Sequence, residues 1–334
     1  MSVRVHIILL LLLLNGMDSA SQVKSPEDFG YRLENLVYRT DTINILVRSQ
    51  KGEEQKQKPV ILFCQGSLPI PLIIYDTAGT YGTFPFNPDI FTSGYHLVII
   101  GKPNVPVVAD ASILQPDLTF RDSTGKLYDA FQKRNNLSYY VDRNLRVVDW
   151  LSSRKWVDPS NIVVAGHSEG SAIAVSMAAG SPKVSRMIYS GGNPLGRTMT
   201  IITRLRKKNP GSDEDVKNQF ELWKAVVDDP TSTDYSQGDP FKTVYGFSQD
   251  FTGHFRKLSI PVLVSYGTND QGAVTANDYL QLEMIRLKKN NIAFISYPLL
   301  EHNYFKADEK GNPDYNEFNW DRVAGDWKRW LDKK

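Results

Sequence analysis

A serine stands between two glycines where an apolar, β-branched run becomes an alanine-rich one. Residues 162–180 read IVVAGHSEGSAIAVSMAAG, with Ser168 at the centre of a G-x-S-x-G pattern. This pattern is typical of a sharp strand-to-helix turn that lifts a serine hydroxyl clear of a sheet. An apolar strand (162–165) precedes the pattern and a helical segment (171–179) follows it. Ser168 is therefore a candidate nucleophile, and the alternative is a turn serine that only caps the helix.

Crowding explains the two glycines, Gly166 and Gly170. A serine at such an elbow takes a strained backbone conformation, and a Cβ two residues to either side would collide with the neighbouring strand or helix. A serine hydroxyl is too weak an acid to ionise alone at neutral pH, so it needs a histidine that removes its proton. The fold must therefore bring a histidine and a carboxylate to the same edge of a sheet.

Short, nearly continuous apolar runs recur along the chain and predict the strands of that sheet. Strand material at 36–49 comes first, followed by runs at 59–67, 95–103, 161–168, 184–192, 260–270 and 292–300. Strands that are apolar on both faces belong in parallel sheets covered by helices. Helical patterns lie at 137–151, 168–179, 276–289 and 320–331. The alternation predicts an α/β fold, a doubly wound, mostly parallel sheet flanked by helices.

In this context the GHSEG pattern resembles the nucleophile elbow of the α/β-hydrolase superfamily, where serine, acid and histidine follow in that chain order. The segment VLVSYGTNDQGAV ends an apolar strand with Asp270 in a turn, and ISYPLLEHNYF ends the next with His302 in a loop. Order and placement both match. The resemblance covers the chain from about residue 36 to its end and is nearer to the dienelactone-hydrolase and prolyl-oligopeptidase-like branches.

The resemblance implies a catalytic triad. Ser168 would attack a carbonyl carbon, His302 would take the proton and return it to the leaving group, and Asp270 would orient and stabilise the imidazolium. Asp270 could instead be only a turn residue, and His302 only a surface histidine.

The resemblance also implies an oxyanion hole of two backbone N–H groups. One belongs to Glu169, directly after the nucleophile. The other comes from the loop after the third strand, where the family often has His-Gly and this chain has Gln65-Gly66-Ser67. Gly66 and Gln65 both remain candidates for the second donor.

Other reactive residues have two interpretations each. Cys64 lies in an apolar strand and is interpreted as a buried structural cysteine rather than a nucleophile. The basic run 204–208 is either a clamp for an anionic substrate or a solvated helix face. Aromatic residues crowd 235–255 and form either a substrate wall or the core of a cap. Glu169 and Glu301 either tune the triad or point into water. No spacing suggests a metal site, a phosphate loop or a dinucleotide site, so no metal or cofactor is expected.

The N-terminus and two long connections divide the chain further. Arg4, the apolar run 7–14 and the small residues after it predict a signal peptide over 1–21, and hence a secreted or periplasmic protein. The run is too short to span a membrane, so no stable membrane insertion is expected. The α/β-hydrolase domain would occupy 22–334, with a cap insertion at about 193–257. A second long connection covers 104–135.

Composition narrows the function classes. The 334 residues carry a formal charge of only +2, and no basic run interleaves with aromatics, so no nucleic-acid partner is expected.

The favoured function is a serine hydrolase, carboxylesterase-like (EC 3.1.1), acting on a small-molecule ester or acyl substrate. A peptidase or acyltransferase with the same triad is the alternative, because the elbow decides the attack and not the leaving group or acceptor. A non-catalytic binding protein of this fold is the alternative from another class. The sequence does not specify the oligomeric state.

Overall fold

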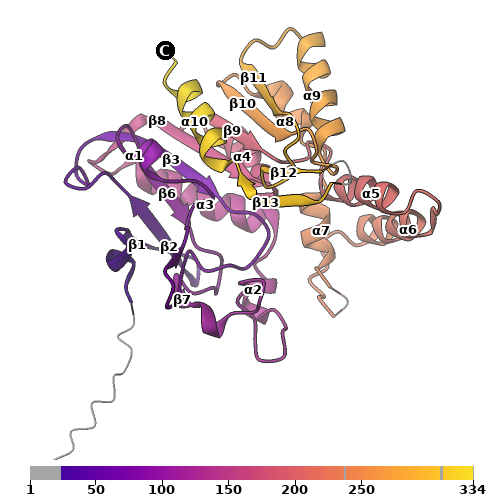
Figure 1. The fold of residues 1–334 in the computed structure, drawn as a ribbon, viewed down its shortest axis with the longest axis horizontal. Coiled ribbons are helices and arrows are strands. Elements are labelled where there is room, and N and C mark those ends of the chain that lie inside the picture. Colours follow the sequence, from indigo (N-terminus) through magenta and orange to yellow (C-terminus); the bar gives the residue numbers. More distant parts are fainter. Residues whose placement is uncertain (1–23, 237, 309–310, 334) are drawn as a thin grey trace, which may run out of the picture.

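The computed structural model describes residues 24–236, 238–308 and 311–333 (Figure 1). The predicted signal peptide, 1–21, lies outside the described residues. An eight-stranded sheet of order β1-β2-β6-β3-β8-β9-β10-β11 forms the centre of the fold. Its strands are β1 (Arg32–Tyr38), β2 (Asp41–Arg48), β3 (Lys58–Cys64), β6 (His96–Ile100), β8 (Val157–His167), β9 (Val184–Ser190), β10 (Val262–Gly267) and β11 (Ile292–Tyr297).

The six apolar runs form the parallel part of this sheet. Strands β6, β3, β8, β9, β10 and β11 pair in parallel, whereas β2 pairs antiparallel with β6 and with β1. The predicted doubly wound, mostly parallel architecture is confirmed. The strand material predicted at 36–49 is confirmed, but it belongs to two strands of a hairpin, in which Arg39 and Thr40 turn the chain between β1 and β2. The sequence lacks the glycine or asparagine that usually signals such a turn.

Different helices cover the two faces of the sheet, because successive strand residues point to opposite faces. On β3, Leu62 packs in one hydrophobic cluster with α3, α4 and α9, and Phe63 packs in the other with α1 and α10. All four predicted helices are confirmed within a few residues at each end. The bounds of these four are α3 (Leu137–Ser152), α4 (Glu169–Gly180), α9 (Val274–Arg286) and α10 (Trp320–Leu331), and the short α1 (Asp89–Thr92) was not predicted.

The connections carry smaller elements. The 104–135 segment contains short elements and contributes β7 to a three-stranded sheet of order β5-β4-β7. Strands β12 and β13 pair after the loop that follows β11. The bounds are η1 (Pro26–Phe29), β4 (Ile73–Tyr75), β5 (Thr80–Tyr81), β7 (Val108–Asp110), η2 (Ala111–Ile113), α2 (Asp129–Gln132), β12 (Phe305–Ala307) and β13 (Pro313–Phe318).

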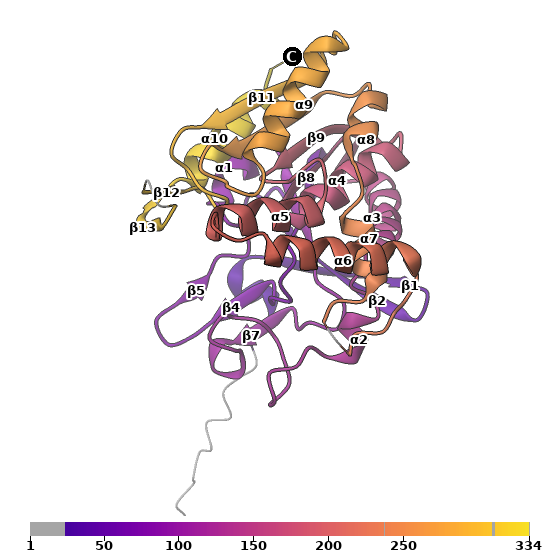
Figure 2. The same cartoon turned by 90° about the vertical axis from the view of Figure 1, so that its right-hand side faces the viewer.

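The 193–257 segment forms four helices between β9 and β10. They are α5 (Arg197–Lys208), α6 (Glu214–Asp228), α7 (Phe241–Phe247) and α8 (Thr252–Lys257). Helices α5 and α6 lie side by side (Figure 2), and their buried residues Ile202, Val216 and Val226 belong to neither core cluster. In contrast, Phe247, Phe251 and Phe255 from the second half of the segment belong to the main core. The segment therefore has an outer pair of helices and an inner part that completes the core.

Candidate active site

Ser168 occupies a strained turn between β8 and α4. Its backbone angles are φ 57° and ψ −125°, a left-handed φ that non-glycine residues rarely adopt. The strand ends at His167 and the helix begins at Glu169, so the whole reversal falls on this one residue. The conformation is the elbow that the G-x-S-x-G pattern predicts.

The flanking glycines are required by close backbone contacts. A Cβ on Gly166 would lie 2.0 Å from the carbonyl oxygen of Gly170. A Cβ on Gly170 would lie 2.1 Å from the carbonyl oxygen of Cys64. Helix α4 is thus pressed against the ends of both β8 and β3. The predicted steric role of both glycines is confirmed.

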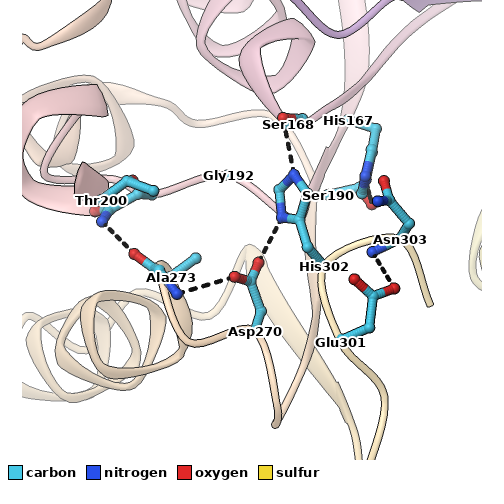
Figure 3. Close-up of polar contacts among 12 residues, drawn as sticks. His167, Ser168, Ser190, Gly192, Thr200, Asp270, Ala273, Glu301, His302 and Asn303 are labelled. Carbon is cyan, nitrogen blue, oxygen red and sulfur yellow. Dashed lines mark hydrogen bonds and ion pairs between the residues drawn. The ribbon is translucent and has the colours of Figure 1, made fainter. Parts of the chain in front are cut away.

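The three residues of the predicted triad lie within hydrogen-bond reach of one another (Figure 3). Ser168 Oγ is 2.9 Å from His302 Nε2, and His302 Nδ1 is 2.7 Å from Asp270 Oδ2. Asp270 follows β10 and His302 follows β11, so parallel strands deliver all three to one edge of the sheet. With Nδ1–H donating to the carboxylate, Nε2 is free to accept the serine proton. The predicted convergence is confirmed, and the catalytic roles remain a prediction.

The Asp270 carboxylate is buried and charged. Burial by itself raises its pKa, but the hydrogen bond and charge of His302, the Arg204 guanidinium at 3.9 Å and the N–H of Gly272 outweigh burial. The pKa of Asp270 therefore lies below its ordinary value. An ionised carboxylate of this kind fixes the tautomer of the histidine.

The loop that carries His302 is held by its neighbour, Glu301. The Glu301 carboxylate accepts hydrogen bonds from the backbone N–H groups of Asn303 (2.7 Å) and Phe305 (3.1 Å). The Glu301 carboxylate thus binds its own loop, and an electrostatic effect on the triad stays a prediction. These two hydrogen bonds brace the loop directly after His302.

His167 lies directly against the histidine of the triad. The two rings are 5.0 Å apart, and His167 is buried. Burial, with a smaller contribution from the charge of His302, lowers the pKa of His167 to about 3. His167 is therefore neutral at neutral pH and places no charge beside the His302 ring.

A buried hydrogen-bond chain beneath the triad was not predicted. His167 Nδ1 lies 3.0 Å from Ser190 Oγ, and Ser190 Oγ lies 2.8 Å from Tyr304 Oη. Tyr304 donates to the Ser265 carbonyl (3.0 Å), and Trp327 Nε1 donates to Ser265 Oγ (3.1 Å). The chain joins the ends of β9 and β10 to the loop of the triad histidine. The sequence feature that could have indicated this chain is a serine near the end of each of two apolar strands, Ser190 in β9 and Ser265 in β10.

The predicted oxyanion-hole residues surround the serine. Glu169 is the first residue of α4, where helix N–H groups have no partner within the helix. A Cβ on Gly66 would lie 3.8 Å from Ser168 Cβ, and Ser67 lines the same cavity as Ser168. The Gln65 side chain turns away and donates to the Ile100 carbonyl (2.6 Å). The identity of the second backbone donor within 65–67 stays a prediction.

A cavity of about 310 Å³ opens at Ser168 and His302. One face of α5 lines it with residues three and four apart, Arg197, Thr200, Ile201 and Arg204. Phe247 and Phe251 line it from the core side, so these aromatic residues serve both as core and as cavity wall.

The other reactive residues are placed as follows. Cys64 is buried, and burial raises the pKa of its thiol to about 12, which fits a structural cysteine. In the basic run, Arg206 pairs with Asp213 (3.0 Å), whereas Arg204 lines the cavity.

Within the described residues, no group of three metal-ligating side chains is placed to hold an ion. No helix in the described part of the chain is long and apolar enough to cross a membrane.

The fold and the elbow together define the architecture as that of the α/β-hydrolases. No family model matches the sequence, and no curated protein matches it. Solved structures do match the fold, at 16% sequence identity or less in the examples that follow.

Three of these structures illustrate the likeness. The 2,6-dihydroxy-pseudo-oxynicotine hydrolase shares 16% identity at a TM-score of 0.54, over 90% of this chain and 67% of its own. A Klebsiella pneumoniae protein assigned as a dienelactone hydrolase shares 12% at a TM-score of 0.52, over 90% and 96%. The acylaminoacyl peptidase of Pyrococcus horikoshii shares 14% at a TM-score of 0.51 over 81%, and this chain spans only 37% of its length. The chain therefore has the α/β-hydrolase fold, as the sequence resemblance implied.

Proposed function

We propose that this protein is a serine hydrolase that cleaves a carboxylic ester, or a related acyl bond, through an acyl-enzyme. The observation that carries the proposal is the continuous relay from Ser168 Oγ through His302 to Asp270, at a strained elbow that opens on a cavity. The names of the neighbours of this fold, two hydrolases and a peptidase, support hydrolysis as the class of reaction.

The acylation half-reaction follows from the geometry. Ser168 Oγ forms a bond to the substrate carbonyl carbon while its proton passes to His302 Nε2, 2.9 Å away. The carbonyl electron pair moves onto the substrate oxygen. When that pair returns, the bond to the leaving group breaks, and the imidazolium gives its proton to the departing oxygen. Water then attacks the carbonyl carbon of the acyl-enzyme and gives a proton to His302. His302 returns this proton to Ser168 Oγ as the carboxylic acid leaves.

Negative charge on the substrate oxygen needs donors that are already in place. The backbone N–H of Glu169 and one backbone N–H from 65–67 are the proposed donors, and the positive end of α4 adds to them. The cavity volume of about 310 Å³ supports a small acyl substrate. We also propose an extracytoplasmic location, on the sequence pattern of residues 1–21.

The proposal is tested by turnover of short p-nitrophenyl esters and dipeptide anilides, with and without an added alcohol acceptor. Ester hydrolysis should exceed anilide cleavage, and Ser168→Ala should lower kcat by roughly 10⁴- to 10⁶-fold. Ser176→Ala is a matched control, because Ser176 lies on α4 and, among the described residues, its hydroxyl donates to the Ala172 carbonyl of its own helix (2.8 Å). Unchanged turnover in Ser168→Ala would overturn the proposal, and dominant anilide cleavage or transfer to the alcohol would reassign the enzyme to the peptidase or acyltransferase class.

A further inference from the structure

Two buried charges meet across the strand that ends at the proposed oxyanion hole. Lys102 follows β6 and Glu169 follows β8, and β3 lies between these strands in the sheet. Lys102 Nζ lies 3.8 Å from Glu169 Oε1, and the side chains are only 3% and 8% exposed. The pair therefore spans the end of β3, the strand from which the 65–67 loop departs, and Glu169 directly follows Ser168.

Lys102 and Glu169 have opposite charges but form no hydrogen bond with each other. Within the described residues, neither Lys102 Nζ nor Glu169 Oε1 has a hydrogen-bond partner. The surface pair Lys183–Asp149, in contrast, closes to 2.6 Å. The Lys102 ammonium rests over the Tyr140 ring at 4.7 Å. A buried ion pair without a hydrogen bond is expected to stabilise the fold only weakly.

Arg197 is the other cation that faces Glu169, and it is shared. Its Nη1 lies 4.0 Å from Glu169 Oε2, while its Nη2 binds Asp239 at 2.7 Å. Lys102 has no second carboxylate partner in the described part of the chain. It is therefore the cation whose charge is available to Glu169 alone.

The position of Glu169 makes this compensation important for the reaction. Its backbone N–H is a proposed oxyanion donor, yet its own carboxylate would repel the negative charge that this donor must stabilise. At an effective dielectric constant of about 20, one uncompensated charge a side-chain length away changes a rate by about 10- to 100-fold. We infer that Lys102 is a positioning residue of this site, which neutralises the Glu169 carboxylate so that negative charge can build on the substrate oxygen; the inference rests on the proposed function.

The pair also implies a pH dependence. The charged and titratable groups that act on Lys102 are Glu169, Arg143, Cys64 and Arg197, and its ammonium lies over the Tyr140 ring. Those that act on Glu169 are Lys102, Arg197 and Asp239; burial raises the pKa of its carboxyl, and the two cations oppose that rise. Burial lowers the pKa of Lys102 to about 8, even though the charge of Glu169 acts in the opposite direction. Above that pH Lys102 loses its proton and leaves the carboxylate less compensated, so kcat should fall. The fall should disappear when Glu169 is replaced by Gln.

The test is a double-mutant cycle of Lys102→Met and Glu169→Gln, with kcat and KM for a short p-nitrophenyl ester measured from pH 6 to 9.5. Lys102→Met should lower kcat about 10- to 100-fold in the wild-type background, with KM within about threefold. In the Glu169→Gln background the same change should cost less than about threefold. Lys183→Met, which removes only the surface pair with Asp149, is the matched control.

An equal loss in both backgrounds, or an alkaline fall that persists in Glu169→Gln, would overturn the inference. If Lys102→Met alone fails to fold, the double variant and the pH profile of Glu169→Gln still decide the question. Labelling of wild-type Ser168 by a fluorophosphonate distinguishes failure of the inference about Lys102 from failure of the proposed function. With Ser168 labelled and the two losses equal, only the inference about Lys102 falls; without the label, both fall.

Discussion

Replacement of Gly166 by alanine tests whether backbone packing sets the position of the nucleophile. The new Cβ would lie 2.0 Å from the Gly170 carbonyl oxygen and 2.4 Å from its carbon. Contacts of this kind are not found below 3.0 Å, so β8 and α4 must separate by about 1 Å. Ser168 is the single residue between them, and an error of about 1 Å in a reacting group costs about 10²-fold in rate. We expect kcat/KM to fall about 100-fold and the free energy of unfolding to fall by about 1–3 kcal/mol.

The assay combines ester hydrolysis with urea unfolding, so that lost activity is measured on folded protein. Gly253→Ala is the matched control, because a Cβ at that position in α8 has nothing within 4 Å. The control should keep full kcat/KM and gain up to about 1 kcal/mol of stability from helix propensity. A Gly166→Ala enzyme with kcat/KM within threefold of wild type would refute the reasoning, because the elbow could then relax without moving the serine.

Three further predictions follow from the site. Asp270→Asn should lower kcat about 10⁴-fold in steady-state assays, because an amide favours the wrong imidazole tautomer; near-normal turnover would move the acid role elsewhere. His167 has a folded-state pKa of about 3 against 6.5 in the unfolded chain, so the unfolded state binds more protons between these values and stability falls with falling pH. Urea unfolding of His167→Gln between pH 6 and 4 should lose about 1.4 kcal/mol less per pH unit than wild type, and an identical slope would contradict this assignment. Glu301→Ala should lower kcat about tenfold by loosening the histidine loop, while the exposed Glu317→Ala should not, and equal activities would show that the loop needs no such support.

The central sheet and the triad could be predicted because their signals are local in the sequence. Strands such as β3 and β10 are buried on both faces and therefore read as continuous apolar runs. Parallel strands end at one edge of the sheet, so Asp270 and His302 could be assigned from their places just after two such runs.

Features that depend on contacts between distant segments could not be predicted. In the sequence Lys102 resembles an ordinary charged residue of a loop. Its burial and its position beside Glu169 depend on how distant segments pack. The role of the aromatic residues in 235–255 also depends on packing, since Phe251 faces both the core and the cavity. The β1–β2 turn uses Arg39 at φ 55°, a conformation that its residue type does not signal.

Active-site labelling with a fluorophosphonate, followed by peptide mapping, tests the central claim most directly. The relay from Ser168 to His302 and Asp270 predicts a single covalent adduct on Ser168, which Ser168→Ala abolishes and Asp270→Asn slows strongly. No adduct, or an adduct on another residue at the same rate in all three proteins, would contradict it.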